Sequence, residues 1–169
     1  IAEIDEKVIR DPSPKIQAEK IARAKAEYVA REHDAIVIAA DTYATVRGTA
    51  LEKPKDANEA KEMLQLLSGN TGITYTGFCY IDRVHAIDFS TTTETQFIFR
   101  TMDEQEIDVY VTRLPVTIWS SVFSPEHPYG MTLLASVNGS FTGNIGLPME
   151  LLIPLLQRSG VVIQPAQME

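Results

Sequence analysis

Near the N-terminus, apolar positions recur along the chain with a helical period. Ser13-Pro14 precedes this segment. Serine is a favoured N-cap, and proline is tolerated in the first helical turn. The apolar positions of the stripe are Ile16, Ile21, Ala24, Tyr28 and Val29. The pattern therefore predicts a helix from Ser13-Pro14 to about Glu32 that buries this stripe.

Farther along, an unbroken apolar run at residues 35–40, "AIVIAA", ends at Asp41. A β-branched run of this kind is typical of a strand that is buried on both faces of a helix-covered sheet. Two strand-like pieces, residues 42–46 and 49–52, flank Arg47-Gly48. They predict a hairpin or a tight turn.

After this hairpin, helical and strand-like patterns continue to alternate. A helix is expected after Asp56, because Glu59 completes a capping arrangement and Gly69 follows the last apolar position. The later elements are strands at 73–81 and 86–99, a helix at 102–113, a strand at 131–137, a helix at 146–160 and a last strand at 161–163. This alternation, without internal repeats, predicts an α/β fold with a mixed, twisted sheet flanked by helices.

One segment, residues 118–130, lacks a regular pattern. Long irregular segments are often functional, so it could be an active-site loop or merely a connection between elements. The sequence leaves both alternatives open.

Charge and composition restrict the partners of the chain. Its 169 residues, 44% of them hydrophobic, suffice for one domain with a sizeable core. Fifteen basic and 23 acidic residues give a net charge of −8, which argues against nucleic acid and against an anionic membrane as partners. The apolar runs are too short to span a bilayer. Cys79 is the one cysteine and is expected to be buried, so the default setting is the reducing cytoplasm.

Candidate chemistry begins at Asp41. In open α/β sheets, ligands gather at the carboxyl ends of strands, where this acid is expected to lie. A carboxylate there can hold Mg²⁺ or take a proton from an attacking water, and Lys53 could fold back to pair with a phosphate oxygen. The structural alternative is an acid that caps a turn, with a surface lysine. Spacing alone does not decide between them.

Several ordered motifs follow one another along the chain. They are Ala40-Asp41-Thr42, Leu51-Glu52-Lys53-Pro54, Leu67-Ser68-Gly69 and Thr76-Gly77, with "EIDEKV" and "IARAKAEYVA" upstream and "VNGSFTGNIGLPMELL" downstream. In this order and separation they resemble the signature of the Maf family, the septum-formation-inhibitor-like nucleotide pyrophosphatases. The likeness covers nearly the whole chain as a single domain, residues 1–169.

The resemblance implies a fold and an activity. Family members have a mixed sheet flanked by helices, with two lobes and a central cleft. They hydrolyse a nucleoside triphosphate between the α and β phosphates, with a divalent metal such as Mg²⁺ or Mn²⁺, and release the monophosphate and pyrophosphate. Many of them form homodimers, so the resemblance also implies a homodimer here.

Roles for individual residues follow from the resemblance as well. Asp41 would be the catalytic base or a metal-binding acid, Lys53 would support the phosphates and the attacking water, and Glu6 would bind the metal. The residues that would contact the substrate are Lys25, Thr42, Thr76, Gly77 and, by a gapless count from the C-terminal motif, Glu126. Without the resemblance, Glu6 and Lys25 would be taken for solvated surface charges.

The chain also departs from the family pattern. The family pattern begins with a strand, a turn with S-A-S-P-R-R and a helix, and Ile1 aligns after this segment, so it is expected to be missing. Either the sequence is truncated there, or the site lacks this phosphate-binding element. Asn70 stands for an arginine, Gly72 for a histidine and Glu52 for a glycine. These losses leave two hypotheses: a metal-dependent nucleotide pyrophosphatase, or a catalytically weak relative that binds a nucleotide or a protein and regulates.

Overall fold

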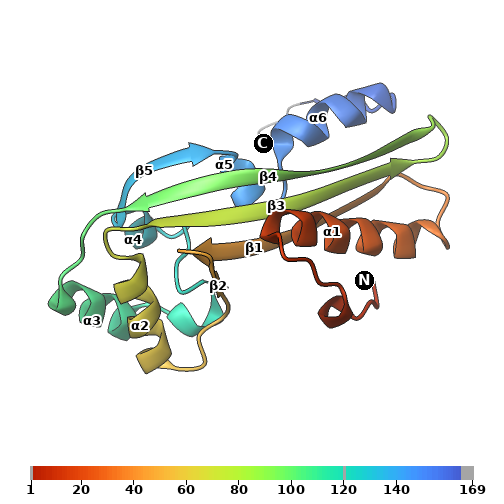
Figure 1. Ribbon diagram of the computed structural model, residues 1–169. Coiled ribbons are helices and arrows are strands. Elements are labelled where there is room, and N and C mark those ends of the chain that lie inside the picture. Colours follow the sequence, from red (N-terminus) through yellow and green to blue (C-terminus); the bar gives the residue numbers. More distant parts are fainter. Residues whose placement is uncertain (1, 120, 165–169) are drawn as a thin grey trace. The chain divides into compact units, whose positions relative to one another are not determined.

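The computed structural model describes residues 2–119 and 121–164 (Figure 1). The chain forms two compact units. Unit 1 contains residues 1–42, 76–93 and 142–169, and unit 2 contains residues 43–75 and 94–141. Each unit is therefore assembled from segments that are far apart in the sequence.

The elements follow the alternation that the sequence predicts. The helices are η1 (Glu6–Val8), α1 (Pro14–Ala30), α2 (Ala57–Leu67), α3 (Glu104–Arg113), η2 (Val116–Ile118), α4 (Pro128–Met131), α5 (Phe141–Asn144) and α6 (Met149–Arg158). The strands are β1 (Val37–Val46), β2 (Thr49–Leu51), β3 (Thr71–Asp82), β4 (Ile87–Phe99) and β5 (Leu134–Gly139).

The described strands belong to one sheet with the order β2-β1-β3-β4-β5. The predicted fold class, an α/β protein with a sheet flanked by helices, is confirmed. Where the sequence suggests a mixed sheet, the β1–β2 and β4–β5 pairings are both antiparallel. The two compact units correspond in number to the predicted lobes, and the central cleft stays a prediction.

Strand β1 differs from its prediction in length and in burial. It continues to Val46, so Asp41 lies in its middle and the expected position at a strand end is wrong. The polar residues after Asp41 stay extended because residues 44–46 pair with β2. The predicted turn between these strands is confirmed, with Arg47 and Gly48 both at positive φ. The strand is not buried on both faces either, since Ile38 is exposed.

Helix α1 of unit 1 buries a narrow face of mostly small residues. The buried positions are Gln17, Ala18, Ile21, Ala22, Ala26 and Ala30. The predicted stripe is only partly confirmed: Ile21 is buried and Val29 packs against the same cluster of alanines, but Ile16 is 46% exposed. At Ala18 the backbone of the helix lies so close to Gly77 of β3 that a Cβ on Gly77 would not fit between them.

The end of α6 also differs from the sequence prediction. Residues 161–164 form no strand. The N–H of Val161 instead donates to the carbonyl of Leu156, and Gly160 adopts a positive φ, which is a common way to end a helix. The predicted last strand at 161–163 is therefore wrong.

Unit 2 packs its helices around large apolar side chains. Phe123 lies edge-on to Phe97 and Phe99, with ring centroids 5.4 and 5.1 Å apart. The predicted helix after Asp56 is confirmed, because this carboxylate accepts the N–H groups of Asn58 and Glu59. Burial of aromatic side chains and a satisfied helix start together stabilise this unit.

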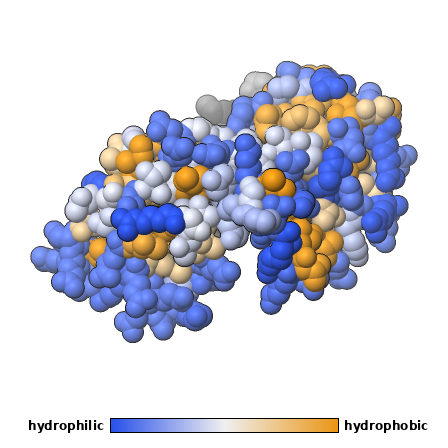
Figure 2. Space-filling view, viewed as in Figure 1, coloured by the Kyte–Doolittle hydropathy of each residue, from blue (hydrophilic) through white to orange (hydrophobic). Residues whose placement is uncertain are grey.

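The surface carries both hydrophilic and hydrophobic side chains. On the face drawn in Figure 2, hydrophobic side chains gather over α6, where Met149 is partly exposed. Within the described part of the chain, no helix is both long enough and apolar enough to cross a membrane.

Candidate active site in unit 1

Three of the predicted site residues meet in unit 1. The ammonium group of Lys25 donates to Asp41 Oδ1 over 2.8 Å and lies 2.9 Å from Glu6 Oε1. The side chains of Asp41 and Lys25 are largely buried, with 15% and 24% of their surface exposed, whereas Glu6 is about half exposed. One lysine therefore bridges two carboxylates from different elements, and one of these carboxylates lies away from solvent.

Each of these side chains is held by local structure. Lys25 lies on α1, which starts where the Ser13 hydroxyl accepts the N–H of Ile16. Glu6 opens η1, whose start is fixed by Asp5, which accepts the N–H of Lys7. Asp41 lies within a strand, so its backbone is held by the sheet. The cluster thus combines a strand, a long helix and a short helical turn.

Burial and neighbouring charges both shift the pKa values of Asp41 and Lys25. Burial is the largest effect on Asp41 and raises its pKa, Glu6 raises it further, and the Lys25 ammonium only partly opposes this. Burial lowers the pKa of Lys25, but the two carboxylates outweigh it and raise the pKa overall. Lys25 therefore stays charged, while Asp41 holds a proton more readily than an ordinary carboxylate does. A carboxylate with a raised pKa is the better proton acceptor in catalysis.

Thr42 and Thr76 meet away from this cluster. Consecutive residues of a strand point to opposite faces of the sheet, so Thr42 and Asp41 face opposite sides. Thr76 is 1% exposed, and its hydroxyl donates to the carbonyl of Gly143 over 2.8 Å. The hydroxyl groups of Thr42 and Thr76 are 3.1 Å apart. Because the Thr76 proton is engaged by Gly143, Thr42 must be the donor between the two hydroxyl groups.

This arrangement separates the predicted substrate contacts. Lys25 lies beside Asp41, whereas the buried Thr76 links β3 to α5 through its hydroxyl group. Gly77 is buried against the backbone of Ala18 in α1. The geometry therefore gives Thr76 and Gly77 structural contacts in unit 1, and leaves Lys25 as the predicted substrate-binding residue that contacts Asp41.

Two further candidates belong to unit 2. Lys53 is exposed in the segment between β2 and α2, and Glu126 is exposed in the turn before α4. Within the described residues, Lys53 makes no ion pair with the neighbouring Glu52. The approach of Lys53 and Glu126 to Asp41 stays a prediction.

Asn70, which stands where the family pattern has arginine, has a structural position in unit 2. Its amide nitrogen donates to the carbonyls of Leu66 and Ser68 at the end of α2, and its oxygen accepts from Arg47 Nε. These bonds use both ends of the side chain. The side chain of Asn70 thus caps the end of α2 and binds Arg47 in the turn between β1 and β2.

The acid–lysine cluster has the chemistry of a site for a divalent cation. Mg²⁺ is often bound by one or two carboxylates, with water and substrate phosphates as the other ligands. Glu6 and Asp41 supply such a pair. Among the described residues, no group of three or more His, Cys, Asp or Glu side chains is placed to hold a metal by itself. These two acids could hold a metal only together with oxygens of the substrate, and they would have to share it with the Lys25 ammonium, which now binds both of them.

Two features of the site were missed by the sequence-based interpretation. The alanines at positions 18, 22, 26 and 30 recur every fourth residue, a signal of a helix that packs closely, yet the larger apolar residues were chosen as its buried face. The contact of Gly143 with Thr76 had no local signal, because 67 residues separate them.

Comparison with known proteins identifies the family. A family model described as Maf-like protein matches residues 1–159. The chain is similar to a dTTP/UTP pyrophosphatase of Bacillus cytotoxicus, with 36% identity over 94% of this chain and 82% of the relative. Proteins of the same name from Deinococcus radiodurans and Pyrococcus furiosus are 34% and 32% identical, over 90% and 91% of this chain and 77% and 80% of the relatives. The chain belongs to the Maf family.

Proposed function

We propose that this protein is a nucleoside triphosphate pyrophosphatase, with dTTP and UTP as the first substrates to test. Family membership and the names of the relatives support this reaction class. The observation that carries the proposal is the contact of Asp41 with Lys25 inside unit 1, beside Glu6.

In the proposed reaction, water attacks the α-phosphorus and the bond from this phosphorus to the bridging oxygen breaks. The products are the nucleoside monophosphate, pyrophosphate and one proton. Asp41 accepts the proton of the attacking water, which suits a carboxylate whose pKa is raised by burial. A divalent metal, when held by Glu6 and the substrate phosphates, would neutralise charge on the phosphates. A metal on Asp41 as well would lower the pKa on which its role as base depends.

Lys25 has two tasks in this proposal. Its ammonium group holds the carboxylate of Asp41 in one orientation and places a positive charge beside the reacting phosphate. Preorganised charges of this kind are worth about 10²–10³ in rate when they face charge that develops in the transition state.

The reaction class is tested by following where the oxygen of water ends up. The protein is incubated with dTTP or UTP and Mg²⁺ or Mn²⁺ in water labelled with ¹⁸O, beside dATP, dCTP and dGTP. We expect pyrophosphate and a monophosphate that carries the label. A label in pyrophosphate would contradict attack at the α-phosphorus, and release of inorganic phosphate would show a different hydrolase.

The metal is tested through Glu6. Glu6→Gln keeps the shape of the side chain but removes its charge, so we expect the Mn²⁺ concentration for half-maximal activity to rise by about tenfold or more. Asp5→Asn, a neighbour in the same turn that accepts the N–H of Lys7, is the matched control and should leave this concentration unchanged. Equal metal dependence of the Glu6 variant and the wild type would remove Glu6 from the metal site.

The second hypothesis, a binding protein with weak catalysis, is favoured by Asn70, whose side chain is committed to structure in unit 2. Calorimetry with dTTP and Mg²⁺ separates the two hypotheses. Binding without release of pyrophosphate from any nucleotide of the panel would support the binding protein.

A further inference from the structure

We infer that Gly77 is a positioning residue, which acts on the reaction by letting α1 approach β3 closely enough for Lys25 to bind Asp41. The inference rests on the proposed function, because it assigns Gly77 a role through Lys25 and Asp41. Unit 1 contains all the residues that carry it.

Gly77 has no space for a side chain. A Cβ built on this residue would lie 2.0 Å from the carbonyl oxygen of Ala18, 2.2 Å from its carbonyl carbon and 2.6 Å from the N of Glu19. These atoms belong to the backbone of a helix and cannot rotate away as the end of a side chain can. Gly77 lies within β3 and does not have a positive φ, so no turn requires glycine here. The requirement at this position is space.

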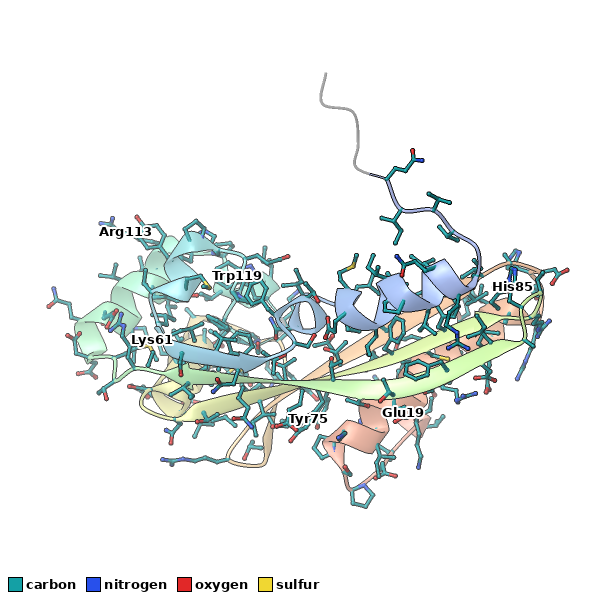
Figure 3. The ribbon with its side chains drawn as sticks, turned by 90° about the horizontal axis from the view of Figure 1, so that it is seen from above. Glu19, Lys61, Tyr75, His85, Arg113 and Trp119 are labelled. Carbon is teal, nitrogen blue, oxygen red and sulfur yellow. The ribbon has the colours of Figure 1, made fainter. Side chains whose placement is uncertain are left out.

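Helix α1 is docked in a fixed position on the strands. Ala18, Ala22 and Ala26 have no exposed surface. Glu19, labelled in Figure 3, accepts a hydrogen bond of 3.0 Å from Ser90, and the Thr92 hydroxyl donates to the carbonyl of Lys15 over 2.9 Å. A helix held along its length moves as a body, so a side chain at position 77 would displace more than the turn that it touches.

Helix α1 also carries Lys25, which binds Asp41. Lys25 follows Ala18 by two helical turns on nearly the same face. Its ammonium group contacts Asp41 and Glu6 at once, over 2.8 and 2.9 Å. To accommodate a Cβ at position 77, α1 must move by about 1 Å or more, which exceeds the tolerance of a hydrogen bond at this distance. A shift of this size moves the ammonium group from its position between the two carboxylates, unless the lysine side chain changes its rotamer.

The chain offers a matched control in the same strand. Gly72 is also a glycine of β3 without a positive φ, but a Cβ there meets the side-chain ends of Phe99 and Leu67 at 3.2 and 3.3 Å. Gly72→Ala and Gly77→Ala make the same chemical change in the same type of backbone. They differ in whether the new methyl group meets the ends of side chains, at 3.2 Å or more, or the backbone of α1, at 2.0 Å.

The test measures kcat and KM for dTTP in both variants. We expect Gly77→Ala to lower kcat by about 10²-fold, the order seen when a catalytic group is misplaced by 1 Å, and Gly72→Ala to change it by less than about threefold. Gly77→Ala is then combined with Lys25→Met. If Gly77 acts through Lys25, the second substitution causes little further loss of kcat. Losses that multiply, or a wild-type kcat in Gly77→Ala, would overturn the inference.

A crystal structure of Gly77→Ala separates this inference from the proposed function. We expect the distance from Lys25 Nζ to Asp41 Oδ1 to exceed 3.5 Å, whether or not the wild type hydrolyses a nucleotide. A distance that stays at 2.8 Å would refute the role of Gly77 alone. A wild type that releases no pyrophosphate would refute the proposed function alone.

If Gly77→Ala does not fold, Ala22→Val applies a smaller displacement to the same side of α1. Ala22 packs in the cluster with Ala26 and Cys79, so two added methyl groups must push the helix away from the sheet. We expect kcat to fall by about tenfold, and this loss to vanish in the Lys25→Met background. An unchanged kcat in a folded Ala22→Val protein would contradict the inference.

Discussion

The two units bury their helices in different ways. In unit 1, α1 meets the sheet through Ala18, Ala22 and Ala26, and its backbone approaches Gly77. In unit 2, α2 and α3 contribute to a core of large side chains such as Leu64 and Phe123. Small residues bring backbones together and fix the position of a helix, whereas large residues bury more apolar area.

This difference coincides with where the charges lie. The closely docked helix of unit 1 carries Lys25, which is largely buried against Asp41. The aromatic cluster of Phe97, Phe99 and Phe123 in unit 2 is apolar. In unit 1, the close docking of α1 places Lys25 beside Asp41, while α6 buries large side chains in a separate cluster that includes Phe78 and Tyr80. The contrast is therefore between α1 and the core of unit 2.

Removing a buried ring from the aromatic cluster of unit 2 should lower stability strongly. Phe99→Ala removes a ring that is 4% exposed and contacts Phe123, so we expect the free energy of unfolding to fall by about 3–5 kcal/mol. Denaturation by urea measures this loss. Phe141→Ala, at a ring that is 42% exposed, is the control and should cost much less. Equal losses in the two variants would show that the buried ring of Phe99 adds no more stability than an exposed ring.

In unit 1, the loss of one charged group should raise the activation free energy of the reaction. Lys25→Met keeps most of the side chain but removes the charge beside Asp41, so we expect kcat to fall by about 10²-fold. The pKa of Asp41 should rise further without its cation, which moves the acid limb of the kcat–pH profile to higher pH.

Lys20→Met is the matched control for this prediction. Lys20 lies on the same helix and forms an ion pair with Asp11, but half of its side chain is exposed. We expect little change in kcat, because exposed ion pairs contribute little and this one does not contact Asp41. A loss of kcat as large as that of the Lys25 variant would show that any charge on α1 matters.

A second buried acid of unit 1 should affect stability and leave catalysis unchanged. Asp82 is 2% exposed and bonds to His85, which Figure 3 labels in the turn between β3 and β4. A hydrogen bond from Ser159, followed by those from His85, lowers the pKa of Asp82 below 3.8. The ionised carboxylate therefore stabilises the fold in full above about pH 4, and this contribution disappears as the pH falls through the lowered value.

Asp82→Asn tests the direction of this pKa shift. We expect the variant to be less stable than the wild type at pH 7, with the difference shrinking as the pH falls below 4 in thermal unfolding curves, and kcat to remain unchanged. A difference that grows in acid would contradict the assignment of the lowered pKa.

The sequence predicted elements whose signals are local. The helix after Asp56 was predicted correctly because its cap and Gly69 lie at its own ends. The turn at Arg47-Gly48 was predicted because two strand-like pieces flank this dipeptide. Both residues adopt a positive φ. Such features depend on a few neighbouring residues, and physical rules for them carry over from other proteins.

Features that depend on distant segments were not predicted. Asp41 was placed at a strand end because nothing local showed that β2 would extend the strand. The buried face of α1 was misassigned because it is decided by the approach of Gly77, which comes 59 residues after Ala18. Lys25 and Glu6 were proposed only through the family resemblance, since no spacing rule brings them to Asp41.

The most direct measurement of the central claim compares pyrophosphate release by the wild type, Asp41→Asn and Asp88→Asn at saturating dTTP. Asp88 is the control, because it also binds a basic residue of α1, Arg23, but is mostly exposed. If Asp41 accepts the proton of the attacking water, its variant loses about 10²-fold or more in kcat while the Asp88 variant stays near the wild type. Equal kcat values for the Asp41 variant and the wild type would show that this carboxylate does not take part in the reaction.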